Sequence, residues 1–276
     1  MRKKRTVVAL AAVAMAALTT LFLAGNGAAS AESGDTAAAP MHFESSELRQ
    51  LLPADGLDAK SASIQPTITI KEAVATGQFE SGPGLTSEPK GCLNMTDALG
   101  DLSGVEGYMQ SGERSVEAAP DSLQRYFMTA VFQIPGGADA AIDKVAEVLR
   151  TCSAGTILLE TGKGEPLKGS ISYAEHKALP LDGARTFAST LTTILPSFTG
   201  LNDEVLPTTE CEAQLTLAAD GDVLIWSVEP TEQLATESVS TVYERALAAR
   251  RVRDERALGP GRRGQAAGRP RPRSGA

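Results

Sequence analysis

The sequence predicts one α+β domain in which an antiparallel or mixed β-sheet packs against helices. Two kinds of pattern carry this prediction. Apolar residues alternate with polar ones in several short runs, which is typical of strands, and they recur every three or four residues in two longer runs, which is typical of helices. The strand runs lie together rather than alternating one by one with helices, which favours an α+β sandwich over a repeated βαβ fold.

The chain begins with the pattern of a secretory signal. Residues 2–5 are basic, residues 7–24 carry no charge, and small residues precede Glu32 where a signal peptidase would cut. We therefore predict that residues 1–31 are a signal peptide, cleaved after Ala31, and that the protein acts outside the cytoplasm. A retained anchor helix is the alternative, but 18 apolar residues lie near the lower limit for spanning a bilayer. No later stretch predicts an integral membrane segment.

Charge divides the rest of the chain. Residues 32–248 hold 13 basic and 32 acidic side chains, a net charge of −19, whereas residues 249–276 hold nine arginines and two acids. A domain this acidic repels nucleic acids and anionic lipid surfaces, so neither class of partner is expected. The roughly 200 residues of the acidic part are enough for one sizeable core.

The ends of this acidic part are predicted to be unstructured. Residues 32–46 are small and polar, which predicts a flexible tether, and we place the domain at 47–248. Residues 249–276 are rich in Arg, Gly and Pro and predict a disordered tail. An arm for an anionic wall polymer, disorder without a function, and a shifted reading frame in GC-rich DNA all fit residues 250–276.

Within the domain, the helices and strands are predicted from the spacing of apolar residues and from the Gly, Pro and cap residues that bound each run. A short helix over 47–52, capped by Ser45 or Ser46, precedes a polar stretch that leads into Cys92. Strands are predicted at 126–134, 156–160, 170–178 and 186–195, and a hairpin with one buried face at 211–217 and 224–228. Helices are predicted over 138–152 and 231–248, the second closing the domain.

Three cysteines, Cys92, Cys152 and Cys211, are spaced by 60 and 59 residues. This spacing matches no paired-cysteine zinc motif, and two histidines are too few to complete a Cys/His cage, so no metal is expected. In an exported protein a structural disulfide is the default, and we favour Cys92 with Cys152. Cys211 lies on the apolar side of its strand and fits a buried small hydrophobe, although pairing with either other cysteine stays open.

Catalytic signatures are not found. The chain holds no G-x-S-x-G elbow, and the S-x-x-K string at Ser87 contains Pro89 where a helix would be needed. His176 is the one histidine inside the predicted sheet and is the only reasonable general base, whereas His42 lies in the tether. We assign no catalytic residue, no metal ligand and no cofactor.

The order of these elements resembles the extracellular sensor domain of PknH-type Ser/Thr kinases and related actinobacterial secreted proteins and lipoproteins. The matching pieces span about 47–248 and are the segment Leu48–Leu57, the start of the region at Cys92, the strand and helix that end at Cys152, the segment Leu179–Phe187, and the closing hairpin and helix. The resemblance implies a curved sheet with a ligand cleft, and it supports the Cys92–Cys152 disulfide. It transfers no catalytic residue, and this chain departs from the family in having no kinase domain and no lipobox cysteine.

We therefore expect a non-enzymatic extracytoplasmic binding or sensor-like domain. Its expected ligand is a small molecule, a lipid or a cell-envelope component held in a partly apolar cleft, by residues that the sequence does not identify. A secreted interaction or inhibitor protein that uses its sheet face or edge is the alternative. A secreted hydrolase using His176 is the third possibility.

Overall fold

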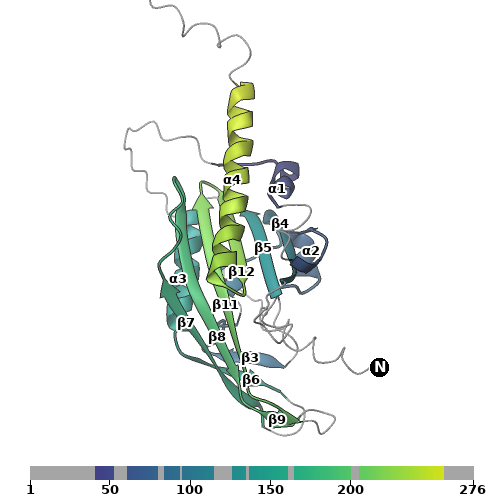
Figure 1. The fold of residues 1–276 in the computed structure, drawn as a ribbon, viewed down its shortest axis with the longest axis vertical. Helices are drawn as coiled ribbons and strands as arrows, with labels where there is room; N and C mark the ends of the chain where they lie inside the picture. Colours follow the sequence, from purple (N-terminus) through teal and green to yellow (C-terminus); the bar gives the residue numbers. More distant parts are fainter. Residues whose placement is uncertain are drawn as a thin grey trace, which may run out of the picture.

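The computed structural model describes residues 41–52, 61–79, 84–93, 95–114, 126–134, 137–160, 165–199 and 205–257. The predicted signal peptide and most of the predicted tail lie outside these residues. Within them the chain forms the expected α+β architecture, a ten-stranded antiparallel sheet with helices on both faces (Figure 1). The choice left between an antiparallel and a mixed sheet is thereby settled.

The strands of the large sheet are short at its edges and long at its centre. They are β1 (Ser61–Ile64), β2 (Ile68–Thr69), β3 (Leu85–Glu88), β4 (Glu106–Arg114), β5 (Tyr126–Gln133), β6 (Gly155–Leu159), β7 (Leu167–His176), β8 (Arg185–Leu195), β11 (Thr209–Asp220) and β12 (Val223–Glu229). A separate two-stranded sheet joins β9 (Phe198–Thr199) and β10 (Val205–Leu206). The helices are α1 (Ser45–Leu51), α2 (Ile70–Ala75), the 3₁₀ helix η1 (Met95–Leu99), α3 (Ala138–Thr151) and α4 (Glu232–Ala257).

The order of strands across the sheet is β1-β4-β5-β12-β11-β8-β7-β6-β3, with β2 also paired to β4. The predicted hairpin is β11 with β12, and its turn at Gly221 and Asp222 joins strands that stay in register from Gln214 opposite Glu229 to Asp220 opposite Val223. Gly221 adopts a φ of +61°, which a residue without a Cβ reaches at little cost. The hairpin therefore places the only tryptophan, Trp226, at the centre of the sheet.

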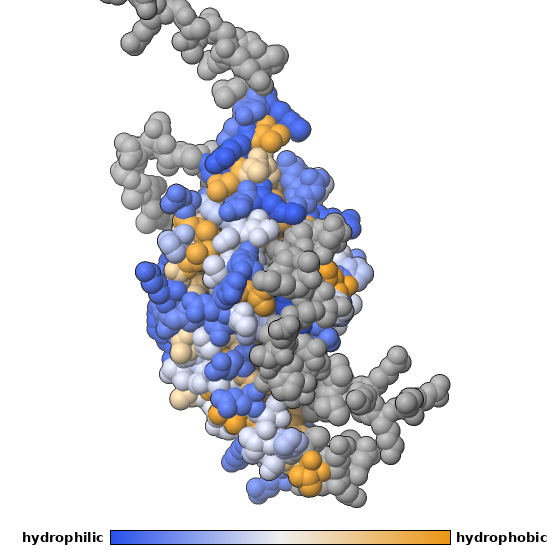
Figure 2. Space-filling model, viewed as in Figure 1, coloured by the Kyte–Doolittle hydropathy of each residue, from blue (hydrophilic) through white to orange (hydrophobic). Residues whose placement is uncertain are grey.

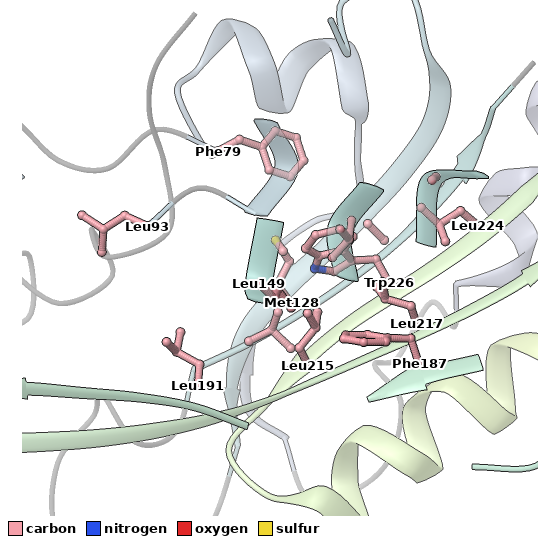
Figure 3. Packing of buried hydrophobic residues seen from close by; sticks show 14 of the residues in the cluster. Phe79, Leu93, Met128, Leu149, Phe187, Leu191, Leu215, Leu217, Leu224 and Trp226 are labelled. Atoms are coloured by element: carbon pink, nitrogen blue, oxygen red, sulfur yellow. The ribbon is translucent and has the colours of Figure 1, made fainter. Parts of the chain in front are cut away.

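Helices cover the two faces of the central strands. Even-numbered residues of β12, such as Leu224 and Trp226, point into the larger apolar cluster, to which α3 also contributes (Figure 3). Phe132 packs edge-on against the indole of Trp226, with ring centroids 6.4 Å apart. Odd-numbered residues, such as Ile225, point into a second cluster beneath α1 and α4. The prediction that this hairpin buries one face is therefore wrong, because α4 returns along the sheet and buries the other face of β12 as well.

The amino-terminal boundary of the domain lies earlier than predicted. Met41 and Phe43 are buried in the cluster beneath α4, so the end of the predicted tether belongs to the fold. The residue that caps α1 is Glu44, whose backbone N–H donates to the Glu47 carboxylate at 3.0 Å, and not a serine. The short apolar pair flanking a polar His42 gave too little periodicity to be recognised as core.

The closing helix extends beyond its predicted end, through residues 249–257. Alanine and arginine favour helical backbone, so the loss of apolar period does not end the helix. Arg250 lies 3.8 Å from the Asp220 carboxylate, and the Arg253 guanidinium donates to the carbonyl of His42 and lies over the Phe43 ring. The first part of the predicted tail is thus helix in contact with the domain, and residues 258–276 lie outside the described residues.

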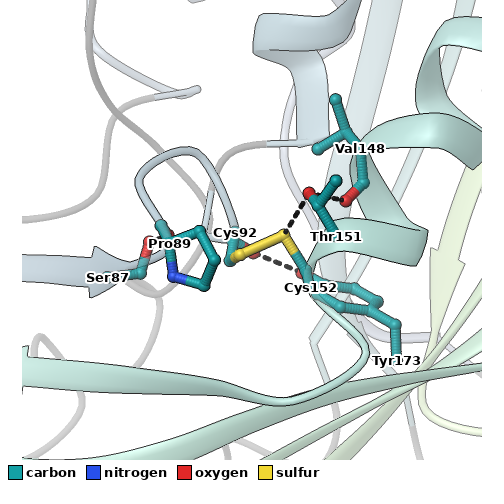
Figure 4. Close-up of a disulfide and its surroundings, with 7 residues drawn as sticks. All are labelled: Ser87, Pro89, Cys92, Val148, Thr151, Cys152 and Tyr173. Atoms are coloured by element: carbon teal, nitrogen blue, oxygen red, sulfur yellow. Dashed lines mark hydrogen bonds between the residues drawn. A yellow bond between two sulfur atoms is a disulfide. The ribbon is translucent and has the colours of Figure 1, made fainter.

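Cys92 and Cys152 form a disulfide, the pair expected from the sequence (Figure 4). It joins the segment after β3 to the end of α3. The Tyr173 hydroxyl on β7 donates to the Cys92 carbonyl at 2.6 Å, and burial raises the pKa of this phenol, which keeps its proton available for the bond. The cross-link and the tyrosine together fix the segment after β3 against the sheet.

A buried ion pair links the beginning of α4 to two strands. The guanidinium of Arg114 on β4 donates to both carboxylate oxygens of Glu229 at the end of β12, at 2.9 and 2.5 Å. The Ser238 hydroxyl on α4 also donates to Glu229, and the guanidinium lies 4.1 Å from the centroid of the Phe127 ring. Both charged side chains are fully buried, so each depends on the other for compensation.

We predict that Glu229→Gln destabilises the fold by about 3–5 kcal/mol, because it leaves the buried Arg114 guanidinium without its carboxylate. The free energy of unfolding is measured by urea titration, with the fluorescence of Trp226 as the probe. Glu244→Gln removes an exposed carboxylate from α4, the helix that follows Glu229, and is the matched control. It is expected to change the free energy of unfolding by less than about 0.5 kcal/mol. Equal losses in the two variants would show that the ion pair has no special role.

We also predict that replacing Cys92 and Cys152 together by serine costs about 4 kcal/mol, the chain-entropy value for a loop closed across a sequence separation of 60. Cys211→Ser is the control, because this half-buried thiol lies outside the cross-link and its loss is expected to cost less than about 1 kcal/mol. Thermal unfolding with and without a reducing agent provides a second readout. A large loss in the Cys211 variant would point to a different cysteine pairing.

Candidate functional site

One half of the sheet presents a solvent-facing surface beyond the reach of α4. The helix starts at Glu232 and runs away from this half, so the far parts of β7, β8 and β11 extend past it in the lower half of Figure 1. Six side chains on this surface carry hydroxyls, and they lie among acidic, amide and apolar side chains. We call it the hydroxyl face and define it by Thr86, Thr156, Ser170, Ser172, Thr190 and Thr192.

Strand register brings these residues together from four strands, β3, β6, β7 and β8, with β11 alongside. Ser172 is opposite Thr192, which in turn is opposite Glu212 on β11. In the next row Thr156 is opposite Ser170. Because paired strands lie about 4.8 Å apart and alternate residues of a strand about 6.8 Å apart, the hydroxyls form a regular two-dimensional array.

The central side chains of this array are exposed or half-buried, and most of them make no bond within the described part of the chain. Ser170 and Glu212 are exposed, and Ser172 and Thr192 are half-buried. Within the described part of the chain, the side chains of Ser172, Thr192 and Glu212 make no hydrogen bond or ion pair. Thr190 differs, because its hydroxyl donates to the Gln214 side-chain carbonyl at 2.8 Å. Most of the array is therefore available to donate to, and accept from, a ligand.

The reverse side of the same strands is apolar and buried. Ile171 and Tyr173 on β7 and Leu191 on β8 alternate with the hydroxyl residues and belong to the larger cluster covered by α3. The disulfide and the Tyr173 hydrogen bond anchor this side. The array is thus held by a packed core rather than by a loop, which keeps the spacing of its groups fixed.

Acidic side chains outnumber basic ones on the hydroxyl face. Glu88, Glu210 and Glu212 lie in its rows, against one basic side chain, Lys168. In the lower half of Figure 2 the visible surface is mostly white and blue, consistent with serine, threonine and charged side chains. The one exposed large apolar side chain in these rows is Ile194, at 36% exposure. The surface suits hydrogen bonding far better than apolar contact.

The residues considered for catalysis in the sequence are not brought together. His176 lies at the border of the hydroxyl face, with Nδ1 3.9 Å from the Glu232 carboxylate, and neither ring nitrogen has a hydrogen-bond partner among the described residues. His42 lies at the other end of the domain, 3.5 Å from the Asp222 carboxylate. Its side chain is 59% exposed, in agreement with the expected exposure. Nothing in this arrangement places a nucleophile at either imidazole.

Cys211 lies on β11 on the same side as the apolar cluster and is half-buried. The expectation of a fully buried small hydrophobe is therefore too strong. The strand leaves the shelter of α3 toward its start, which explains the partial exposure. In the residues that the structure describes, no cluster of three or more His, Cys, Asp or Glu side chains could hold a metal ion.

The hydroxyl face itself was missed in the sequence, although a signal for it exists. Alternation within 211–217 identifies the apolar side of that run, and 186–195 is predicted only as a strand, so no polar surface is assigned to either. Only strand order shows that the polar sides of β6, β7, β8 and β11 are neighbours, since β11 pairs with β8 across the unpredicted connection through β9 and β10.

None of the helices in the described ranges is long and apolar enough to cross a membrane. No family model matches the chain, and no curated protein matches it. Among solved structures, it is similar to an uncharacterised protein of Mycobacterium smegmatis, an ortholog of Rv0999, with 14% identity and a TM-score of 0.40 over 74% of this chain and 96% of that one.

Proposed function

We propose that the protein is a non-enzymatic extracytoplasmic binding domain, sensor-like in character, that recognises a component of the cell envelope. The observation that carries the proposal is the hydroxyl face, an ordered array of exposed and half-buried side chains, of which Ser172 and Thr192 at its centre make no hydrogen bond within the described part of the chain. An extracytoplasmic location is supported by the disulfide and by the predicted signal peptide.

The resemblance to PknH-type sensor domains adds weight to binding rather than catalysis, since that resemblance concerns layout and carries no catalytic motif. The domain would then present the array to its surroundings while the predicted leader takes the chain out of the cytoplasm. A small molecule or lipid in an apolar cleft, the other ligands considered, would use the larger apolar cluster instead of the polar surface. The polar surface favours an envelope component among the three.

A second candidate is supported by the sheet edge. β3 is a four-residue edge strand, and such an edge pairs with an extended segment of another chain. In this alternative the domain binds or inhibits another exported protein. The two candidates differ in which surface is covered, the hydroxyl face around Thr192 or the outer edge of β3.

The proposal is tested by sedimentation of the mature protein with an insoluble cell-envelope fraction from its host. We expect the protein to pellet with the fraction and Thr192→Arg, which places a bulky charge at the centre of the hydroxyl face, to stay in the supernatant. Ser153→Arg is the matched control, an exposed serine beyond α3, and is expected to pellet as the unmodified protein does. Thermal unfolding verifies that both variants are folded.

If the unmodified protein does not pellet, the envelope-binding proposal fails. Native mass spectrometry of the secreted protein, compared with its denatured mass, then distinguishes what it carries instead. A discrete small mass lost on denaturation would support a small-molecule or lipid ligand, and a second polypeptide at fixed stoichiometry would support the protein-partner candidate.

A further inference from the structure

Resting on the proposed function, we infer that the hydroxyl face binds a neutral glycan, laid across β7, β8 and β11. The inference depends on which chemistry this surface can satisfy and which it repels. Three properties decide it: the type of the exposed groups, their spacing, and their charge.

The exposed groups match a polyhydroxylated ligand. A serine or threonine hydroxyl donates one hydrogen bond and accepts two, as does each hydroxyl of a sugar, so the two kinds of group can pair in either direction. Ser172 and Thr192 face each other on neighbouring strands, and the Glu212 carboxylate beside them accepts only. A sugar hydroxyl that donates to Glu212 can accept from Thr192.

The spacing suits an extended polymer rather than a single small molecule. The rows repeat from Gln214, Thr190 and Ala174, through Glu212, Thr192 and Ser172, to Glu210, Ile194 and Ser170. Each row advances by about 6.8 Å along the strands. Similar donors and acceptors therefore recur over several steps, which allows many weak contacts to add along a chain of sugar units.

Charge and apolar area argue against other ligands. Three glutamates against one lysine in these rows, within a region of net charge −19, repel a phosphate- or carboxylate-bearing polymer. A protein partner would need buried aromatic or apolar anchors at the centre of its interface, and the centre here is Thr192. A lipid tail would find only Ile194 and the half-buried Leu158 as large apolar side chains in the described rows. A neutral glycan is the envelope component that meets none of these obstacles.

The test uses the envelope fraction itself, treated in separate portions with anhydrous hydrogen fluoride, with protease or with organic solvent. Anhydrous hydrogen fluoride cleaves glycosidic bonds and leaves peptide bonds intact, and we expect it to abolish sedimentation of the protein, while protease digestion and lipid extraction leave sedimentation unchanged. Binding is expected to differ little between low and high salt, because a neutral ligand releases no counterions.

A double variant, Ser172→Ala with Thr192→Val, removes two central hydroxyls with little change in shape. At about 1 kcal/mol for each hydrogen bond lost, its apparent affinity for the fraction is expected to fall about thirtyfold. Ser153→Ala is the control and is expected to bind normally. Both proteins are compared by thermal unfolding, so that a folding defect is not mistaken for loss of binding.

The outcomes separate the inference from the proposal on which it rests. Binding that survives hydrogen fluoride, that is lost after protease or lipid extraction, or that falls steeply with salt would overturn the glycan while leaving an envelope-binding domain. Normal binding by the double variant would move the ligand away from the hydroxyl face. Failure to bind the untreated fraction would remove the proposed function as well.

Discussion

The structure depends on burying both faces of the central strands at once. β12 has no exposed residue, because α3 covers the side that holds Trp226 and α4 covers the side that holds Ile225. A strand that is buried on both faces needs an apolar layer on each side. α4 supplies the layer opposite α3 because the chain reverses direction directly after β12. The Arg114–Glu229 pair lies at that reversal, where it joins β4, the end of β12 and the start of α4.

This constraint also explains why the two halves of the sheet differ in character. α4 runs from the reversal in one direction only, so it covers only one half of this face of the sheet. Beneath the helix, this face holds the second apolar cluster, with Val131 and Ala218, and buried polar side chains such as Glu229. Beyond the helix, the same face of the same sheet carries Ser172, Thr192 and Glu212. The boundary between core and candidate site is thus set by where one helix begins.

Local pattern predicted the elements that have strong periodicity. The helix over 138–152, the strands over 126–134 and 186–195 and the closing hairpin all appear near their expected bounds. Each has a regular apolar side, and apolar period is the signal that a single sequence contains most clearly.

Elements without such a pattern were not recognised. β4 contains Gly107 and Gly112, where a Cβ would lie 2.3 Å from the Val131 carbonyl and 2.1 Å from that of Ser63. Glycine is needed there because neighbouring backbone approaches closely, and its presence removes the apolar alternation that marks a strand. β1, β2 and β3 have at most four residues each, too few to establish a period. The candidate site was beyond prediction for another reason, since it depends on which strands are neighbours and not on any one of them.

The two ends of the described chain meet at the same end of the domain. The Met41 carbonyl accepts from the Asp222 backbone N–H at 3.1 Å, and Arg253 near the end of α4 contacts His42. The helix that separates this end from the reversal at Glu229 has 26 residues, a length of about 39 Å. A fusion partner, a purification tag or a surface linkage attached at residue 41 or at residue 257 would therefore hold the domain by one end. The hydroxyl face lies toward the other end and would stay open to the medium.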